Sequence, residues 1–271
     1  MIVAVDTGGT KTLIAGFGEE GVASGQVKFP TPPDTTEYIN TLKSTLEENY
    51  GNQPVEAIVV AVPGIIKDGV AIWCNNLGWQ NFNVASALQG VLGNAPVFIE
   101  NDANLAGLAE TRSLDNTPPQ SLYVTISTGI GTGIITEGFI DPSLRHSEGG
   151  RMLVEFGGKI QEWEQFASGR AIKETYGKYA RDITDPQTWN EVADRISRGF
   201  LAVIPLLQPD VIIIGGSIGT YFDRYESALK GILQQKLPAH IPCPEFKQAK
   251  HPEEAVIYGC YQHATDSLNT N

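Results

Sequence analysis

The sequence is poor in the residues that build disulfide frameworks and structural metal sites. Its 271 residues include 3 cysteines, Cys74, Cys243 and Cys260, and only 4 histidines. The number of cysteines is odd and no two of them have the spacing of metal ligands. Both facts argue against a zinc site and for a reducing compartment.

Long hydrophobic runs are also missing. The chain opens directly into a short apolar run at residues 2–5, without the basic stretch and apolar segment of a signal peptide. Its longest apolar runs are far shorter than the span of a membrane helix. We therefore expect a cytoplasmic protein that has no membrane partner.

Basic charge is scarce as well. Lysine and arginine together number 19, against 31 aspartates and glutamates, so the formal net charge is −12. A protein of this charge repels phosphate backbones, and we expect no nucleic-acid partner. A small phosphate-bearing ligand is still compatible with the composition, because one loop can bind it through backbone N–H groups and a metal ion.

What the sequence does contain is an alternation of short apolar runs with stretches of helical periodicity. This alternation predicts an α/β fold, and the length suits one large domain or two modest ones. The expected strands are residues 2–5, 13–17, 22–29, 57–62, 97–99, 122–126, 134–136 and 211–214. The expected helices are residues 36–49, 84–92, 103–110, 189–207 and 253–265.

Two glycine-rich turns follow apolar strands about half a chain apart, which predicts two related lobes. Either turn alone could be a tight hairpin and nothing more, but a matched pair favours the binding of phosphate groups, because glycine lets backbone N–H groups come close to a ligand. Neither turn has the spacing of a Walker A loop or opens a helix. The candidate phosphate-binding residues are Gly8, Gly9, Thr10 and Lys11 in the first turn, and Thr128, Gly129, Gly131 and Thr132 in the second.

Polar residues at three further strand ends are candidates for chemistry. Asp6 could hold Mg²⁺ beside the first turn, or it could only cap that turn. Asp102 could take a proton from an attacking hydroxyl, or it could be a helix N-cap. Gly215 and Gly216 could let a flat group such as adenosine pack closely, or they could form a simple turn.

Together these residues resemble the ROK family, whose members include repressors and sugar kinases. The resemblance covers nearly the whole chain and implies an actin-like, hexokinase-like (ribonuclease H-like) ATPase fold with a cleft between two lobes. It implies ATP and Mg²⁺ as cofactors, Asp102 as general base, and sugar contacts from Asn76, Asn101, Glu148 and Glu164. The matching blocks are Asp6-Thr7-Gly8-Gly9-Thr10-Lys11-Thr12, Asn75-Asn76-Leu77-Gly78-Trp79, Glu100-Asn101-Asp102-Ala103-Asn104, Ser127-Thr128-Gly129-Ile130-Gly131-Thr132-Gly133 and Phe166-Ala167-Ser168-Gly169-Arg170-Ala171.

One block departs from the family pattern. The family has a Gly-Glu-x-Gly-His stretch, and here Ser147-Glu148-Gly149-Gly150-Arg151 stands in its place. Residues 152–164 contain no cysteine, so the family's zinc motif is absent and no zinc is expected. Arg151 could contact an anionic sugar or pair with an acidic side chain, and we favour the pairing, since most arginines form ion pairs.

The first lobe is expected at residues 1–117, and a C-terminal helix at 253–271 is expected to pack back onto it. The second lobe is expected at residues 118–252. The polar, proline-rich residues 115–120 would join the two lobes. The resemblance also allows a homodimer.

Three functions stay open at this point. The first is an ATP-dependent hexose kinase that phosphorylates the C6 hydroxyl, with sugar and ATP as its small-molecule partners. A polyphosphate-using glucokinase ranks second, because Lys11 is the one basic residue expected near a phosphate turn. A non-catalytic sugar-binding protein is third. A repressor would need a DNA-binding segment before the first strand, and that strand begins at Ile2.

Overall fold

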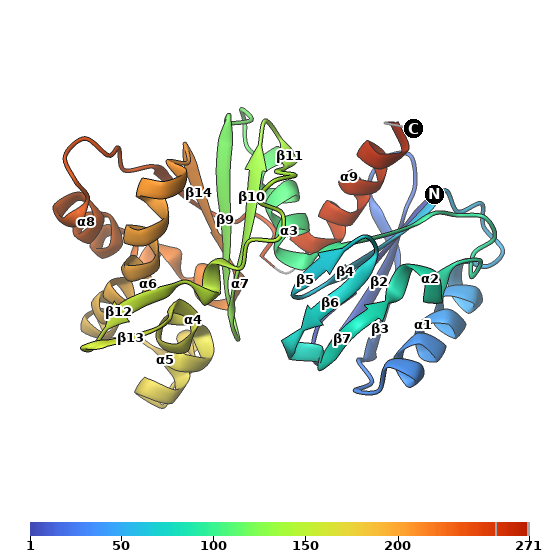
Figure 1. The fold of residues 1–271 in the computed structure, drawn as a ribbon, viewed down its shortest axis with the longest axis horizontal. Coiled ribbons are helices and arrows are strands. Elements are labelled where there is room, and N and C mark those ends of the chain that lie inside the picture. The colour runs from blue at the N-terminus through green and yellow to red at the C-terminus, as the bar shows by residue number, and fades with distance from the viewer. Residues whose placement is uncertain (253, 270–271) are drawn as a thin grey trace. The chain divides into compact units, whose positions relative to one another are not determined.

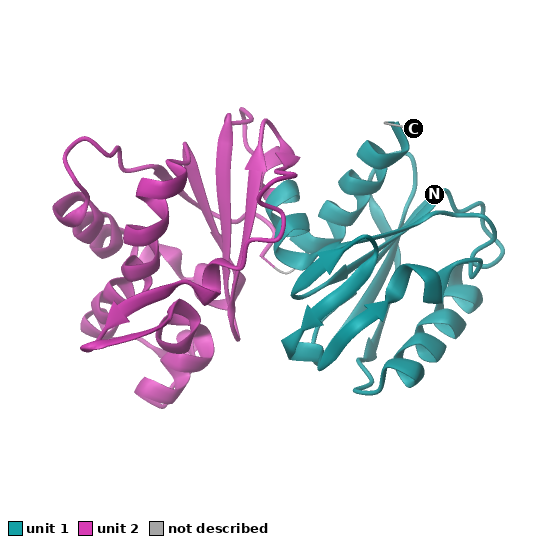
Figure 2. Ribbon diagram, viewed as in Figure 1, with its two compact units in different colours: residues 1–109, 254–271 teal, residues 110–253 magenta. Residues whose placement is uncertain are grey.

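The computed structural model describes residues 1–252 and 254–269. The chain forms two compact units, one made of residues 1–109 and 254–271 and the other of residues 110–253 (Figure 2). The division falls inside helix α3 (Asp102–Arg112). Within the described residues, no helix combines the length and the apolar character needed to cross a membrane.

The first unit is built on a five-stranded sheet with the order β3-β2-β1-β4-β8. The hairpin β1/β2 is antiparallel, whereas β1, β4 and β8 run parallel to one another. A three-stranded sheet, β5-β6-β7, follows β4 in the chain. The strands are β1 (Ile2–Thr7), β2 (Lys11–Phe17), β3 (Ala23–Pro30), β4 (Ala57–Val62), β5 (Ile65–Lys67), β6 (Val70–Cys74), β7 (Trp79–Asn83) and β8 (Val97–Asn101).

Helices lie on both faces of this sheet (Figure 1). α1 (Thr35–Tyr50) buries a stripe at helical spacing that includes Leu42 and Leu46, and these side chains join Val3 and Val5 in one core. Asp34 caps α1 by accepting the backbone N–H groups of its first turn. α9 (Ala255–Asn269) packs on the opposite face against β1 and β4. The helix predicted at 253–271 corresponds to α9, and residues 253, 270 and 271 lie outside the described residues.

The second unit repeats the plan with a sheet of order β11-β10-β9-β14-β15. β9 and β10 form an antiparallel hairpin, and β14 lies parallel to both β9 and β15. A separate two-stranded hairpin, β12-β13, precedes the helices. The strands are β9 (Gln120–Ile126), β10 (Ile130–Thr136), β11 (Phe139–Ile140), β12 (Leu153–Phe156), β13 (Lys159–Glu162), β14 (Val211–Gly215) and β15 (Glu245–Gln248).

The core of the second unit lies between its sheet and two long helices. Phe200 of α6 and Leu229 of α8 belong to the same buried cluster as Val124 and Ile212 of the sheet. α6 begins at Pro186, which is suited to a first helical turn because it has no N–H group to satisfy. The remaining helices of the chain are α2 (Val84–Leu88), α4 (Trp163–Ala167), α5 (Gly169–Tyr176), α6 (Pro186–Leu207), α7 (Gly216–Gly219) and α8 (Glu226–Lys236), with short 3₁₀ turns at Asn75–Leu77, Gly149–Arg151, Ala180–Asp182 and Phe222–Arg224.

The two five-stranded sheets therefore share one topology. In each, an antiparallel hairpin is followed by two parallel strands added beside the first strand of that hairpin. The mixed α/β architecture and the repeat predicted from the two glycine-rich turns are confirmed. The elements that the sequence patterns missed include β12, β13, β15, α4, α5 and α8, most of which are no longer than eight residues.

Candidate active site

The parallel strands of the first unit bring Asp6 and Asp102 to the same edge of the sheet. Asp6 pairs in register with Ala61 of β4, and Ala61 pairs with Glu100 of β8. Asp102 is the first residue of α3, directly after β8. Since neighbouring strands lie about 4.8 Å apart, the ends of β1 and β8 are separated by about 10 Å.

The carboxylate of Asp102 has a fixed orientation and an unusual proton affinity. Its Oδ1 accepts the backbone N–H of Ala103 at 2.8 Å. Burial raises the pKa of Asp102 above its ordinary value of 3.8, and the hydrogen bond from Ala103 opposes this effect only in part. A carboxylate whose pKa is raised binds a proton more readily than an ordinary carboxylate, which suits it to accept a proton during a reaction.

The pKa of Asp6 is also raised. Burial, with a smaller contribution from the charge of Asp102, raises the pKa of Asp6 to about 7, while Lys11 acts in the opposite sense. Two carboxylates that disfavour each other's charge would be stabilised by a divalent cation. Within the described residues no group of three or more His, Cys, Asp or Glu side chains could hold a metal ion. A cation here would therefore need ligands beyond the protein, as Mg²⁺ usually does.

The residue that caps α3 is Asn101, and Asp102 is the first residue of the helix. Oδ1 of Asn101 accepts the backbone N–H of Asn104 at 3.0 Å, and its Nδ2 donates to the carbonyl of Gly64 at 2.9 Å. Glu100 Oε1 accepts both the Asn101 N–H and the Asn104 side-chain amide. This network fixes the start of α3, and with it the position of Asp102. A sugar contact from Asn101 stays a prediction.

The first glycine-rich turn is a tight hairpin. The N–H of Gly8 donates to the carbonyl of Lys11 at 3.0 Å, and the side chains of Thr10 and Lys11 are exposed. Gly9 lies directly against Asn76, because a Cβ atom at Gly9 would be 3.1 Å from the Asn76 carbonyl oxygen. The fold thus brings the predicted phosphate turn and a predicted sugar-binding residue together.

The second glycine-rich turn is shorter than predicted. The N–H of Ser127 donates to the carbonyl of Gly129 at 2.9 Å, and β10 begins at Ile130. Gly131 and Thr132 therefore lie in a strand rather than at the tip. The hydroxyl of Thr132 accepts the N–H of Gly149 at 3.0 Å. Thr128 and Gly129 remain at the tip, and the phosphate role of all four residues stays a prediction.

Ser127 joins the second turn to two other segments of the same unit. Its carbonyl accepts the N–H of Gly169 at 2.6 Å, and its hydroxyl accepts the N–H of Ser217 at 3.0 Å. Gly216 has a φ angle of 78°, and a Cβ atom there would be 2.7 Å from the carbonyl oxygen of Ile126. Glycine is thus required at position 216, where α7 starts beside the turn.

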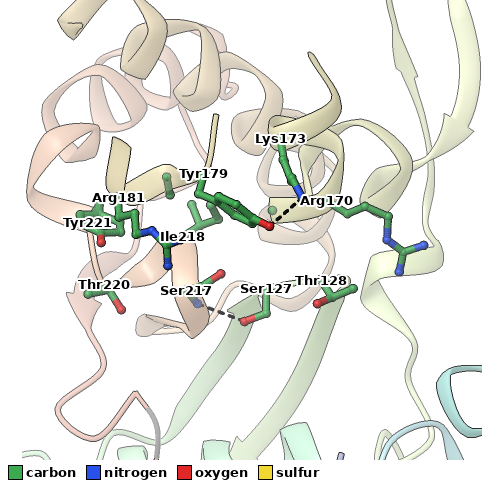
Figure 3. Close-up of a pocket in the computed structure, with 12 residues that line it drawn as sticks. Ser127, Thr128, Arg170, Lys173, Tyr179, Arg181, Ser217, Ile218, Thr220 and Tyr221 are labelled. Carbon is green, nitrogen blue, oxygen red and sulfur yellow. Dashed lines mark hydrogen bonds between the residues drawn. The ribbon is translucent and has the colours of Figure 1, made fainter. Parts of the chain in front are cut away.

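A pocket of about 520 Å³ opens where these three segments meet (Figure 3). Lys173 donates to the hydroxyl of Tyr179 at 2.7 Å across this pocket, and both Lys173 and Arg181 lie against the Tyr179 ring. The lining residues are Ser127, Thr128, Gly169, Arg170, Lys173, Tyr179, Ala180, Arg181, Ser217, Ile218, Thr220 and Tyr221. The pocket offers an aromatic ring, basic side chains and the second turn, which suits a nucleotide.

Sequence reasoning missed the basic side chains of this pocket. Lys11 was expected to be the one basic residue near a phosphate turn, but Arg170, Lys173 and Arg181 line the same pocket as Thr128. The signal was present in the sequence, because residues 170–181 contain four lysines and arginines in an acidic protein. The pattern gave no way to place them beside residue 128.

The pairing predicted for Arg151 is confirmed. Its Nη1 lies 2.7 Å from Glu162 Oε2 and 3.2 Å from Glu164 Oε1. Burial would lower the pKa of Arg151, but the hydrogen bond to Glu162 and the charges of Glu164 and Glu148 raise it overall. Glu148 and Glu164, both predicted sugar contacts, are thus grouped around one cation.

Comparisons with known proteins agree with this architecture. The chain is 27% identical over 237 residues to a fructokinase of Pediococcus pentosaceus, covering 80% of each chain. It is 30% identical over 236 residues to a polyphosphate glucokinase of Mycobacterium tuberculosis, covering 83% of this chain and 81% of the relative. A ROK family glucokinase from Streptomyces griseus, solved with glucose and AMPPNP, superposes with a TM-score of 0.81 at 21% identity, covering 98% of this chain and 99% of that one.

The actin-like, hexokinase-like fold expected from the sequence is thereby confirmed. The ROK family model matches residues 2–266. The chain belongs to the ROK family.

Proposed function

We propose that this protein is a sugar kinase that transfers the γ-phosphate of ATP to the C6 hydroxyl of a hexose. The observation that carries the proposal is the position of Asp102, a carboxylate with a raised pKa at the edge of the sheet that also bears Asp6 and the first glycine-rich turn. Sugar kinases among the relatives, including the fructokinase, support the same reaction class.

The reaction needs one proton acceptor and an in-line attack. Asp102 accepts the proton of the sugar hydroxyl, the hydroxyl oxygen attacks the γ-phosphorus, and the bond to the bridging oxygen of ADP breaks. The products are a sugar phosphate and ADP. The hydrogen bond from Ala103 holds Asp102 Oδ1, so the carboxylate keeps one orientation while it accepts the proton.

The residues present fit a magnesium ion near Asp6. Mg²⁺ prefers carboxylate oxygens, water and phosphate oxygens, and when bound it neutralises charge on the phosphates. Asp6 would hold it directly or through water, and the cation would relieve the repulsion between Asp6 and Asp102. At the neighbouring turn, the exposed residues Gly9, Thr10 and Lys11 would contact phosphate.

The nucleotide is proposed to occupy the pocket of the second unit. Thr128 and Gly129 would contact phosphate. Gly215 and Gly216 would serve the nucleotide indirectly, because a Cβ atom at either position would meet Tyr123 or Ile126, and glycine lets α7 start close beside the turn. Asn76, Asn101, Glu148 and Glu164 are proposed to contact the sugar. None of these sugar contacts requires zinc.

The test is ADP release with Mg²⁺ and a panel of hexoses, amino sugars and N-acetyl sugars. At least one sugar should be phosphorylated, and NMR of the product should place the phosphate on C6. Release of no ADP with any sugar, together with measurable sugar binding, would show a sugar-binding protein instead of a kinase.

A second donor, inorganic polyphosphate, is favoured by the basic lining of the pocket. Arg170, Lys173 and Arg181 provide positive charge where an acidic protein would otherwise repel a polyanion. Polyphosphate use should fall steeply with added salt, because several charges act together. Equal glucose phosphate yields from ATP and polyphosphate at low salt would identify a dual-donor enzyme, and no yield from polyphosphate would exclude this candidate.

A further inference from the structure

Arg151 occupies an unusual place among the acidic side chains of the second unit. It ends the 3₁₀ turn Gly149–Arg151, and its guanidinium meets Glu162 at 2.7 Å and Glu164 at 3.2 Å. About 31% of the Arg151 side chain is exposed, and the carboxylates are shielded to a similar degree. Partial shielding makes such charged hydrogen bonds stronger than those of a fully exposed ion pair.

Glu164 uses its other oxygen on the second glycine-rich turn. Oε2 accepts the backbone N–H of Ile130 at 3.2 Å, and a Cβ atom at Gly129 would lie 2.7 Å from this oxygen. The carboxylate of Glu164 is therefore held between the Arg151 guanidinium and the backbone of the turn. A carboxylate held through both oxygens has one orientation.

The backbone around Arg151 is itself fixed. The N–H of Gly149 donates to Thr132, and a Cβ atom at Gly150 would clash with the carbonyl of Ile130. The N–H of Trp163 donates to the carbonyl of Met152 at 2.9 Å, which places the start of α4 beside Arg151. Arg151 and Glu164 thus come from two segments, the 3₁₀ turn and α4, and each segment contacts β10 or the turn before it.

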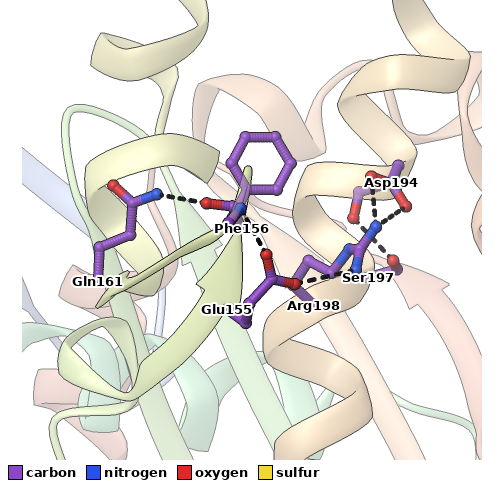
Figure 4. A network of polar contacts seen from close by, with 7 residues as sticks. Glu155, Phe156, Gln161, Asp194, Ser197 and Arg198 are labelled. Atoms are coloured by element: carbon purple, nitrogen blue, oxygen red, sulfur yellow. Dashed lines mark hydrogen bonds and ion pairs between the residues drawn. The ribbon is translucent and has the colours of Figure 1, made fainter.

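A second arginine in the same unit offers a contrast. Arg198 of α6 pairs with Asp194 at 2.8 Å and approaches Glu155 at 3.9 Å (Figure 4). Both arginines contact two carboxylates, and their side chains are similarly exposed, at 31% and 27%. Glu164 contacts a glycine-rich turn, whereas Asp194 bonds to Arg198 within α6 and Glu155 accepts the N–H of Gly158 within the β12-β13 hairpin.

We infer that Arg151 is a positioning residue for sugar recognition, because it holds the Glu164 carboxylate against the turn at Gly129 and Ile130 in the orientation that sugar hydroxyls meet. Arg151 acts through Glu164 and does not itself contact the sugar. The inference rests on the proposed function, since it assumes that Glu164 binds the sugar.

The experiment compares Arg151→Gln, Arg151→Lys and Arg198→Gln with the wild-type enzyme, using the sugar of the panel that has the highest kcat/KM. Arg151→Gln should raise the KM for that sugar about tenfold, because it removes a charged hydrogen bond. The KM for MgATP should stay within about threefold, since Lys11 and the basic pocket are untouched. Arg151→Lys should restore part of the affinity, since lysine keeps the charge but cannot bridge two carboxylates equally well. Arg198→Gln should leave both KM values unchanged.

A double variant tests whether Arg151 acts through Glu164. If it does, Arg151→Gln combined with Glu164→Gln should bind the sugar no more weakly than Glu164→Gln alone. Fully additive losses would overturn the inference. So would an unchanged or lower sugar KM in Arg151→Gln, because Arg151 would then be neutral or would compete with the sugar for Glu164. If Arg151→Gln does not fold, Arg151→Lys and Glu162→Gln replace it. An unchanged sugar KM in both of these variants would then overturn the inference.

Calorimetry with the same sugars separates this inference from the proposed function. A wild-type protein that binds a sugar without releasing ADP would contradict the kinase proposal, while the Arg151 inference would still predict a tenfold loss of sugar affinity in Arg151→Gln. A wild-type protein that binds no sugar of the panel would overturn both.

Discussion

The two units carry the same sheet topology but surround their glycine-rich turns with different chemistry. In the first unit, the edge of the sheet bears the two carboxylates Asp6 and Asp102, both with raised pKa values. In the second unit, the pocket beside the turn is lined by basic side chains, Lys173 among them. The same backbone topology thus carries negatively charged side chains in one unit and positively charged side chains in the other.

The difference shows that the turn itself does not determine what a unit does. Gly8 and Ser127 each close a hairpin with a backbone hydrogen bond near 3 Å. What differs is a helix from later in the chain: α3 places a carboxylate beside the first sheet, and α5 places cations beside the second turn. A substitution that removes a carboxylate of the first unit should therefore affect the chemical step, and one that removes a cation of the second unit should affect ATP binding.

The largest effect is expected at Asp102. Asp102→Asn should lower kcat by about 100-fold or more, since a general base is lost. The asparagine can still accept the Ala103 N–H through its side-chain oxygen, so the start of α3 should persist and sugar binding, measured by calorimetry, should change little. A near-normal kcat would remove Asp102 from its role and would erase the contrast between the units.

Asp6 should make Mg²⁺ binding depend on pH. Its pKa is raised from 3.8 to about 7, so protons compete with the cation below pH 7. The Mg²⁺ concentration for half-maximal activity should rise about tenfold per pH unit below 7 in the wild type. Asp6→Asn should show little of this pH dependence. Asp68→Asn, at an exposed turn of the same unit, is the matched control.

The same shift predicts a stability effect in the absence of metal. Between about pH 4 and pH 7 the folded protein binds more protons at Asp6 than the unfolded chain does, so its stability falls as pH rises through this window. Asp6→Asn should flatten that slope and raise Tm at pH 8 in EDTA. An unchanged Tm profile between pH 5 and pH 8 would contradict the raised pKa.

In the second unit, Gly216→Ala tests the close contact between Gly216 and the backbone of Ile126 beside the pocket. The φ angle of 78° and the contact with the Ile126 carbonyl should cost about 1–3 kcal/mol of unfolding free energy. The KM for ATP should rise while the sugar KM changes less. Gly231→Ala, in the middle of α8 with open space around it, should instead stabilise the protein slightly. Chemical denaturation of both variants measures the difference.

The smallest effect is expected at the basic side of the pocket. Lys173→Gln removes a cation that contacts Tyr179, and the KM for ATP should rise about threefold, as expected for an exposed charge. Lys178→Gln changes a neighbouring exposed lysine that is absent from the pocket lining. Equal effects of the two substitutions would show that general charge, and not the pocket, is responsible.

Local sequence patterns predicted what depends on neighbouring residues. The strand at 57–62 and the helix at 36–49 were predicted from their apolar spacing, and the glycine-rich turns from their composition. The position of Asp102 after a strand could also be predicted. The division of roles between Asn101, which caps α3, and Asp102 could not, because both residue types are common at helix starts.

Features that join distant segments were beyond such patterns. The raised pKa of Asp6 depends on its burial in the fold and on the charge of Asp102, and the pocket joins residues near 127, 173 and 217. The end of the second turn at Gly129 is set by pairing of Ile130 with Ile126, which a run of glycine and threonine does not reveal. Glu164 reaches Ile130 from a helix too short to show periodicity.

The contact between α9 and α3 has a consequence for biosynthesis. Gly259 packs so closely on Leu105 that even a Cβ atom would overlap the Leu105 backbone. The first unit therefore lacks one wall until residues 254–269 have left the ribosome, whereas residues 110–253 form an uninterrupted unit that is synthesised earlier. The unit whose first residues are translated earliest is thus completed last, and the carboxylates Asp6 and Asp102 acquire their folded surroundings only after the whole second unit has been synthesised.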